Sequence, residues 1–388
     1  MIYLHRPKLQ KKTITECHKV LQTNWISSGG SYIKKFENSV KKIVKTNYAV
    51  PFLNCTSALQ ISLFLCGANK KTEILVPSTS FIGTANSILY NNSNPFFLDV
   101  ADDLNLDVNK ALKFLDNKTF KKKNLTFNKI TKKRIACILI VHVFGNPLND
   151  IDKLKKKCKE LNIFLIEDCA ESLGSYYLKK GKKIHTGVHG DISCFSFNGN
   201  KIVTAGSGGM LCTNNKIFEK RARYLSTTAK DNFYDFTHNS LGYNFSISNI
   251  NACIGFNELK ELDIILKKKK IIHNLYRKSL EKFSNIELIG HDIKNKESNY
   301  WLNVIKIKNK KNLNKDFMNF SKRNNFETRA VWKLLYAQKH LKKFNSSNCT
   351  KSKNFIKNCF CLPSGLELKK KNILKISNDI KNFLNSIK

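Results

Sequence analysis

The residue best placed for chemistry is Lys201, which stands between a predicted strand and a glycine-rich run within residues 190–213. Residues 192–197 are β-branched and aromatic and predict a strand, and the small residues 198–200 predict a turn after it. A lysine held at such a junction can be desolvated and aimed at one point, as a Schiff-base lysine must be. The chain contains 68 Lys and Arg residues, so a surface lysine beside a turn is the competing interpretation of this stretch.

A second stretch ends in an acidic pair. Residues 163–166 are apolar and are followed by Glu167 and Asp168, which is the pattern of a buried parallel strand with carboxylates at its carboxyl end. Ligands of open α/β sheets bind at that end. A carboxylate there could keep a pyridine nitrogen protonated, as the aspartate of pyridoxal phosphate (PLP) enzymes does. The alternative is that the pair caps the next helix.

These two stretches, IEDCAESLGS at 166–175 and GDISCFSFNGNK at 190–201, together resemble the DegT/DnrJ/EryC1/StrS sugar aminotransferases, and further segments match in order over nearly the whole chain. The resemblance implies an aspartate-aminotransferase-like α/β fold (PLP fold type I). It predicts an N-terminal arm at 1–30, a large PLP-binding domain with a mainly parallel sheet at 31–258, and a smaller C-terminal α/β domain at 259–388.

The resemblance implies PLP as the cofactor and gives roles to residues that match the family. Lys201 is the expected catalytic residue, which binds PLP and moves protons, and Asp168 is expected at the ring nitrogen. Glu171 lies where many relatives have Gln or His, and is expected near the phenolic oxygen of the ring. The remaining cofactor-binding residues implied are Thr56, Ser57, Phe81, Ser196, Asn198 and Asn244.

Several of these residues also have plain structural interpretations. Thr56 and Ser57 begin a predicted helix, whose N–H groups can bind a phosphate, but their hydroxyls would equally make a good N-cap. Phe81 matches the aromatic that stacks on the cofactor ring, and could instead be core. Asn244 ends a Gly-Tyr-Asn element that in the family reaches the cofactor phosphate of the neighbouring subunit. A homodimer with a shared active site is therefore expected.

Substrate contacts are expected from the N-terminal arm and from two later positions. The residues implied are Trp25, Ser27, Asn86 and Arg329. The arm could also form a plain turn, and Arg329 could make a structural ion pair instead of holding a substrate anion.

The wording FNGNK, with a glutamate in DCAES, resembles a subgroup that aminates nucleotide-linked 4-keto-6-deoxy sugars, the bacillosamine and legionaminic acid type. The expected reaction moves an amino group from an amino acid to the 4-keto group of UDP-4-keto-6-deoxy-GlcNAc. The expected amino donor is glutamate, and the product is expected to serve the synthesis of surface glycan precursors. The alternatives are a GDP-perosamine-type enzyme and a non-catalytic regulator with the same fold. Dehydratase relatives carry histidine in place of the lysine, so Lys201 argues against that activity.

The composition limits the possible partners. The chain has 388 residues, 41% of them hydrophobic. This length and hydrophobic content are enough for a large and a small globular domain. The formal net charge is +39. Such a charge could indicate nucleic acid or an anionic membrane, but the lysines are spread through every segment. We expect neither partner. A positive field should instead attract a phosphate-bearing cofactor and an anionic nucleotide sugar.

The twelve cysteines lie mostly in apolar runs and form no CxxC motif, which predicts reduced buried thiols and no metal site. The sequence shows no signal peptide and no apolar run of membrane-spanning length, so the cytoplasm is the expected compartment.

The elements that must position the site follow from periodicity and turn residues. Helices are predicted at 31–45, 105–116, 150–161, 217–225, 247–282, 314–324 and 369–386, and a further helix is predicted after the turn that follows Pro77, within 74–89. Strands are predicted at 48–53, 74–77, 95–99, 135–143, 163–166, 286–289 and 300–307. The lysine-rich segment 117–133 is predicted as a surface loop, and the four lysines at 267–270 as a solvated helix face.

Overall fold

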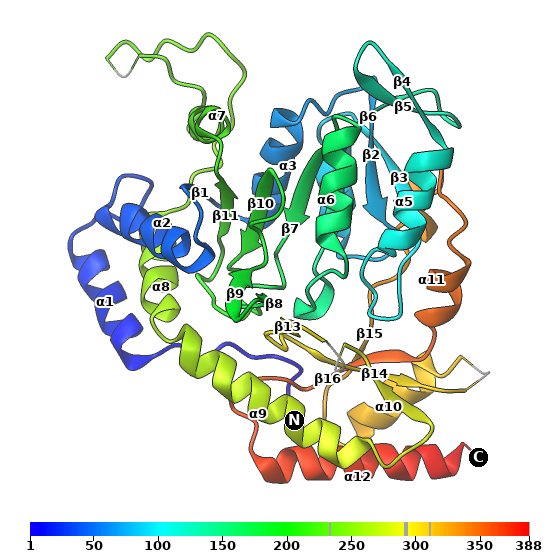
Figure 1. The fold of residues 1–388 in the computed structure, drawn as a ribbon. Helices are drawn as coiled ribbons and strands as arrows, with labels where there is room; N and C mark the ends of the chain where they lie inside the picture. Colours follow the sequence, from blue (N-terminus) through cyan, green and yellow to red (C-terminus); the bar gives the residue numbers. More distant parts are fainter. Residues whose placement is uncertain (233, 291–293, 310–311, 388) are drawn as a thin grey trace.

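The computed structural model describes residues 1–387 apart from 233, 291–293 and 310–311 (Figure 1). Its main sheet has nine strands. In sheet order the central strands are β1 (Tyr48–Phe52), β11 (Gly209–Thr213), β10 (Ile192–Ser196), β7 (Phe164–Asp168), β6 (Arg134–Val141), β2 (Thr72–Pro77) and β3 (Asn94–Leu98). The strands from β10 to β3 pair in parallel, and β11 is antiparallel to both β10 and β1. The predicted α/β fold with a mainly parallel sheet is confirmed.

Helices cover both faces of this sheet because its strands are apolar on both sides. Along β6, Leu139 packs into one hydrophobic cluster and Ile140 into another, as successive residues of a strand must. Helix α3 (Cys55–Leu65) packs on β10 and β11 from the first face, and α6 (Ile151–Glu160) packs on β7. The other helices up to residue 259 are α1 (Lys11–Gln22), α2 (Ser31–Val44), α4 (Ile82–Leu89), α5 (Val108–Asn117), α7 (Lys216–Ser226) and α8 (Asn249–Leu259), with one 3-10 turn, η1 (Val143–Gly145).

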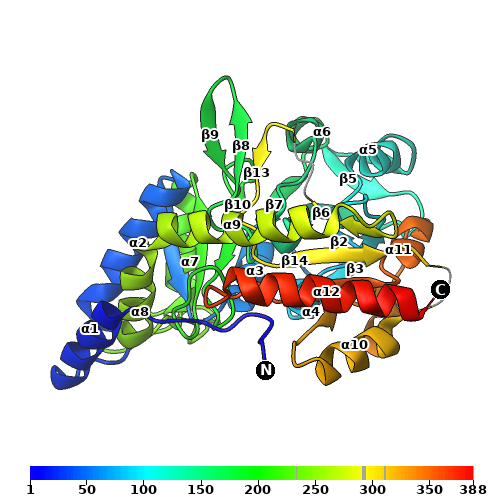
Figure 2. The same cartoon turned by 90° about the horizontal axis from the view of Figure 1, so that it is seen from below.

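A second, four-stranded sheet lies below the first and is antiparallel throughout. Its strands in order are β12 (Ile286–Leu288), β14 (Asn303–Ile307), β16 (Cys359–Leu362) and β15 (Arg329–Ala330). Two long helices, α9 (Leu262–Leu280) and α12 (Lys370–Ser386), run side by side across it (Figure 2). The shorter elements here are α10 (Asn314–Arg323), η2 (Leu335–Ala337), η3 (Lys339–Leu341) and α11 (Thr350–Phe355). The boundary predicted at 258 falls at the end of α8.

A small sheet ties residues after α9 to the main body. Its strands are β13 (Lys296–Glu297), β8 (Tyr176–Lys179) and β9 (Lys182–His185), and all its pairs are antiparallel. Because β13 pairs with β8, the chain that enters the second sheet is held against the segment that follows β7.

The prediction of a surface loop at 117–133 is wrong, because this segment contains a hairpin formed by β4 (Thr119–Lys122) and β5 (Leu125–Asn128). The two turn residues, Lys123 and Asn124, both have positive φ, at 47° and 59°. Such a pair forms the turn whose twist suits a hairpin. The prediction failed because the lysines hide the alternation of the short strands.

The prediction that the four lysines at 267–270 form a solvated helix face is wrong for Lys269, which is fully buried. The other three lysines are exposed. Lys269 follows Ile265 by four residues and precedes Ile272 by three, so helical periodicity places it in the buried row of α9.

The cysteines are free thiols, and all but Cys17 are buried. Across the described ranges, no helix is both long enough and apolar enough to cross a membrane.

Candidate active site

Lys201 lies in the segment between β10 and β11, which follows the carboxyl end of the parallel strand β10. Its backbone N–H donates to the carbonyl of Asn198 at 3.0 Å, which closes the predicted turn. Its ammonium lies 3.9 Å from Glu171 Oε1 and 3.9 Å from the centroid of the Trp301 ring. Burial lowers the pKa of Lys201, and nearby Glu171 and Asp168 oppose that shift. The amine is therefore easier to deprotonate than an exposed lysine.

Asp168 is the last residue of β7, and its side chain is held by two donors. Thr84 Oγ1 donates to Oδ2 at 2.8 Å, and the N–H of Ala170 donates to Oδ1 at 3.1 Å. Burial raises the pKa of Asp168, while these hydrogen bonds favour the ionised form. A fixed, buried carboxylate of this kind is suited to binding a protonated ring nitrogen.

Glu171 is also buried, and the N–H of Phe144 donates to its Oε2 at 2.6 Å. Burial raises its pKa, and the charge of Lys201 opposes the rise. The loop that supplies this N–H includes Gly145, whose φ is +89° and where a Cβ would lie 1.9 Å from Asn299 Oδ1. Glycine is thus required at this position.

Arg329 begins β15 of the second sheet and approaches the same region. Its guanidinium lies 4.6 Å from the centroid of the Trp332 ring. Its Nε and Nη2 atoms are buried and have no hydrogen-bond partner among the described residues. Unpaired buried donors are costly, so these two nitrogens are available to a bound anion.

These groups surround one cavity of about 360 Å³, a size ordinary for small-molecule sites. The predicted residues that line it are Thr56, Phe81, Asp168, Glu171, Ser196, Asn198, Lys201 and Arg329. Phe81 is half exposed and meets the Trp332 ring edge to face at 5.6 Å. Thr56 lies in the first turn of α3, so free helix N–H groups point toward the cavity beside its hydroxyl.

Five predicted residues do not line this cavity. Ser57 is buried in the cap of α3, where its N–H and hydroxyl both donate to Asn54 Oδ1. Asn86 pairs with His340, and Trp25 and Ser27 lie exposed in the turn before α2. Asn244 is exposed in the chain between α7 and α8.

The structure adds two residues that the sequence reasoning gave no role. Thr84 holds Asp168, and Trp301 forms the surface beneath Lys201. A hydroxyl three residues after Phe81, in the first turn of a predicted helix, was the available signal for Thr84. Trp301 lay in a segment already matched to the family, but its contact with Lys201 joins residues 100 positions apart.

The acidic pair at the end of β7 has two separate roles, because successive strand residues face opposite sides of the sheet. Glu167 accepts from His142 Nε2 at 2.9 Å and from the N–H groups of Gly187, His189 and Gly190. Burial opposes ionisation, but the hydrogen bond from His142 lowers the pKa of Glu167 to about 2. Glu167 thus anchors the turn before β10, while Asp168 faces the cavity.

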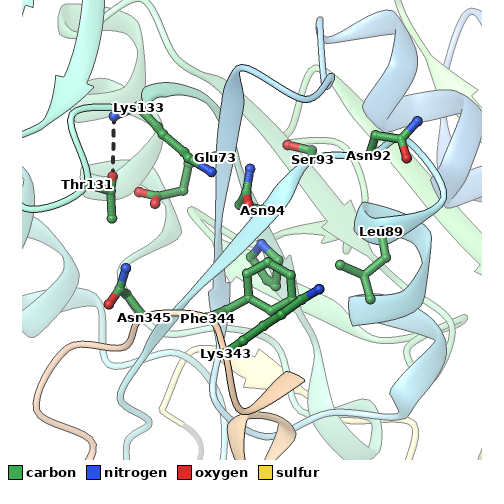
Figure 3. A pocket seen from close by; sticks show the side chains of 11 residues that line it. Glu73, Leu89, Asn92, Ser93, Asn94, Thr131, Lys133, Lys343, Phe344 and Asn345 are labelled. Carbon is green, nitrogen blue, oxygen red and sulfur yellow. Dashed lines mark hydrogen bonds between the residues drawn. The ribbon is translucent and has the colours of Figure 1, made fainter. Parts of the chain in front are cut away.

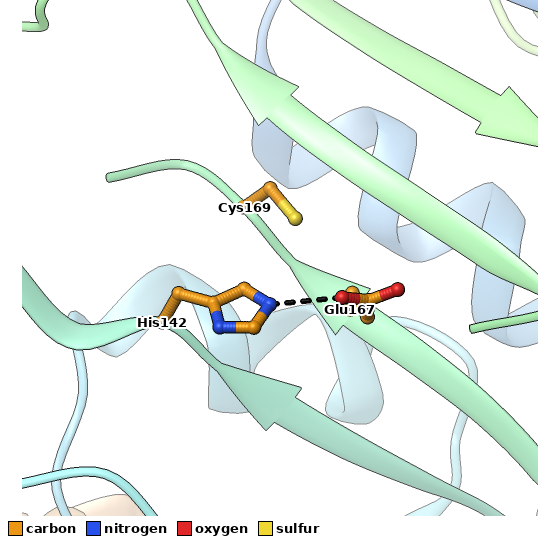
Figure 4. A group of neighbouring side chains, drawn as sticks. All are labelled: His142, Glu167 and Cys169. Carbon is orange, nitrogen blue, oxygen red and sulfur yellow. Dashed lines mark hydrogen bonds and ion pairs between the residues drawn. The ribbon is translucent and has the colours of Figure 1, made fainter. Parts of the chain in front are cut away.

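His142, Glu167 and Cys169 are close enough to be considered as metal ligands (Figure 4). His142 Nδ1 accepts from the N–H of Leu148 at 3.1 Å, so its Nε2 carries the proton that Glu167 accepts. The histidine and the carboxylate are therefore already engaged in hydrogen bonds, which account for the group as a structural one.

A larger cavity, about 600 Å³, lies at the opposite edge of the sheet, where β2 and β3 begin (Figure 3). Glu73, Lys133 and Phe344 are among its lining residues. It contains none of the residues predicted for the site, and it faces the amino ends of parallel strands, where ligands of such sheets do not ordinarily bind.

Comparison with known proteins shows the family to which the chain is similar. The family model described as the DegT/DnrJ/EryC1/StrS aminotransferase family matches residues 7–381. GDP-perosamine synthase of Escherichia coli O157:H7 is 32% identical over 304 residues, covering 78% of this chain and 76% of the relative. The UDP-4-amino-4,6-dideoxy-N-acetyl-beta-L-altrosamine transaminase of Campylobacter jejuni (strain 81-176) is 30% identical over 294 residues, covering 74% of this chain and 73% of the relative. A solved structure, Helicobacter pylori PseC, an aminotransferase involved in the biosynthesis of pseudoaminic acid, superposes with a TM-score of 0.87 at 22% identity, covering 99% of both chains.

Proposed function

Because the chain belongs to the DegT/DnrJ/EryC1/StrS aminotransferase family, a family of PLP-dependent sugar aminotransferases, we propose that it transfers an amino group from L-glutamate to the 4-keto group of a nucleotide-linked 4-keto-6-deoxy sugar. The observation that carries the proposal is the convergence of Lys201, Asp168, Glu171 and Arg329 on one cavity. An amine, two buried carboxyls and an unpaired guanidinium are the groups that this transfer needs.

The cavity fits PLP by the chemistry of its walls. Asp168, fixed by two donors, would hold the ring nitrogen in its protonated form. Thr56 and the first turn of α3 would hold the phosphate, together with Ser196 and Asn198, which line the same cavity. Phe81 would lie against the ring. Lys201 would bind the cofactor aldehyde through its amine.

When bound, PLP supplies a protonated ring that withdraws electrons from the carbon atom losing a proton. Lys201 would act as the base, taking the proton from Cα of the amino donor and delivering it to the former aldehyde carbon of the cofactor, and it would move protons in the opposite direction when the sugar is aminated. Its lowered pKa suits this role, since more of the amine is neutral near pH 7. Glu171, 3.9 Å from Nζ, is placed to orient the ammonium between the two transfers.

Arg329 supports binding of an anionic substrate through its two unpaired nitrogens. The net charge of +39 would speed the approach of a nucleotide sugar. Trp25, Ser27, Asn86 and Asn244 lie outside the cavity of their own chain. We propose that the active protein is a homodimer in which Asn244 serves the phosphate site of the other subunit, and that the N-terminal arm and Asn86 contact the sugar nucleotide.

The sugar is proposed to be UDP-linked 4-keto-6-deoxy-GlcNAc, with the GDP-linked 4-keto-6-deoxy sugar as the second candidate. The FNGNK motif and the glutamate of the DCAES motif favour the UDP-linked sugar. A relative named GDP-perosamine synthase, at 32% identity, favours the second. The two relatives are 32% and 30% identical to this chain, so sequence identity favours neither sugar.

The test is the kcat/KM of purified protein with each ketosugar and glutamate. A tenfold or greater preference for the UDP-linked sugar is the expected result. Equal turnover of both would remove the subgroup assignment, and turnover of neither, with PLP bound, would remove the proposed reaction.

A further inference from the structure

A second buried lysine, Lys269 on α9, lies close to the candidate site without lining its cavity. Its ammonium donates to the carbonyl of Trp301 at 2.9 Å and to the carbonyl of Ser364 at 2.6 Å. Lysine is almost never fully buried unless its charge is compensated. Burial lowers the pKa of Lys269 to about 7, and Glu367 opposes the shift. A residue kept at this cost needs a reason beyond filling space.

One of its acceptors, Trp301, also contacts the catalytic segment. The indole N–H of Trp301 donates to the carbonyl of Asn200, next to Lys201, at 2.6 Å. The indole ring lies beneath the Lys201 ammonium, 3.9 Å from its centroid. The same ring stacks on Phe144, whose N–H holds Glu171. Lys269 thus fixes the main chain of the residue whose side chain supports Lys201.

The other acceptor joins Lys269 to the second sheet. Ser364 follows β16, and its hydroxyl accepts from both the N–H and the side-chain amide of Asn303, the first residue of β14. Lys269 therefore holds two neighbouring segments, the one that carries Trp301 and the one after β16, at a fixed distance from α9. Either the neutral amine or the ammonium can make both bonds.

We propose that Lys269 is a positioning residue for Lys201: by holding the carbonyls of Trp301 and Ser364, it keeps the Trp301 ring beneath the Lys201 amine. This inference rests on the proposed role of Lys201, but it concerns the position and environment of that amine, which can be measured without any turnover.

The test compares full-length wild type, Lys269→Met and Lys268→Met, all free of cofactor. Methionine keeps the length and apolar stem of Lys269 and removes its donors, and Lys268 is an exposed neighbour on the same helix. Trace acetylation across pH 6–10, with the Lys201 peptide quantified by mass spectrometry, gives the pKa of the Lys201 amine. Burial is the main cause of its lowered pKa, so loosening the Trp301 ring should admit water and raise the midpoint by about one pH unit. The Lys268→Met midpoint should equal that of wild type.

An unchanged Lys201 midpoint in Lys269→Met, with only the melting temperature lowered, would show that Lys269 serves stability alone and would overturn the proposal. If that variant does not fold, Trp301→Phe tests the remaining half of the link, since it keeps a ring but loses the hydrogen bond to Asn200. Its midpoint should move in the same direction by a smaller amount, and no movement there overturns the proposal as well. Wild type that shows the lowered midpoint but no transamination would instead refute the proposed function.

Discussion

Lys269 is fully buried and the side chain of Lys201 is only 13% exposed, and the two contact different parts of one residue, Trp301. Lys201 lies over the ring and faces a cavity with carboxyl groups on its walls. Lys269 lies at the main-chain carbonyl, and its amine is committed to two hydrogen bonds. Burial lowers the pKa of both. A lowered pKa therefore does not by itself identify a catalytic lysine, because the amine must also face a space that a substrate can enter.

The sharpest way to separate the two lysines is to remove Lys201, the one proposed to be catalytic. Lys201→Ala should lower kcat/KM for transamination by about four orders of magnitude or more, because both the covalent attachment and the base are lost. Lys268→Met, an exposed control, should keep wild-type activity. Steady-state kinetics with glutamate decide it, and a Lys201→Ala variant within tenfold of wild type would break the distinction.

A second large effect is expected at the carboxylate that faces Lys201 across the cavity. Asp168→Asn keeps the shape of the side chain but cannot hold a positive ring nitrogen, so kcat should fall by about 10²–10³. PLP content, measured separately after acid release, should change much less. Full activity in this variant would mean that Asp168 serves only to cap the chain after β7.

Titration of Lys269 should instead make the free energy of unfolding depend on pH. Its pKa is about 7 when folded and near 10.5 when unfolded, so between these values the unfolded chain binds more protons. The free energy of unfolding of wild type should therefore rise with pH by about 1.4 kcal/mol per pH unit from this group. The penalty is largest below pH 7 and disappears as the pH rises toward 10.5.

Lys269→Met lacks this dependence. The difference in melting temperature between wild type and Lys269→Met should shift in favour of wild type from pH 7 to pH 9. A difference that stays constant over this range would mean that the Lys269 amine does not titrate as its burial requires.

The smallest effect is expected at Glu171. Glutamine keeps the length and the hydrogen-bonding oxygen of this side chain, so Glu171→Gln should change kcat by no more than about tenfold. The Lys201 midpoint should fall, since the nearby carboxyl group raises the pKa of Lys201 in wild type. The acetylation measurement described for Lys269→Met reads this shift, and a midpoint that rises would contradict the assigned contact.

The sequence predicted the sheet, Lys201 and Asp168 because their signals are local: an apolar strand, its polar end and the turn after it. Thr84 and Trp301 complete the site from remote segments, and no spacing rule links them to Asp168 or Lys201. Lys269 was misread because four consecutive lysines suggested a solvated face, although its row with Ile265 and Ile272 was visible in the sequence. The roles proposed for Asn244 and Trp25 need the proposed second subunit, which the folding of one chain does not define.

The most direct test of the central claim is to locate the lysine that binds the cofactor. Purified protein with PLP is reduced with borohydride, digested, and searched by mass spectrometry for the phosphopyridoxyl group. We expect stoichiometric label on Lys201 and none on Lys269, although burial lowers the pKa of both amines. Label on Lys269, or label scattered over surface lysines with Lys201 unmodified, would contradict it.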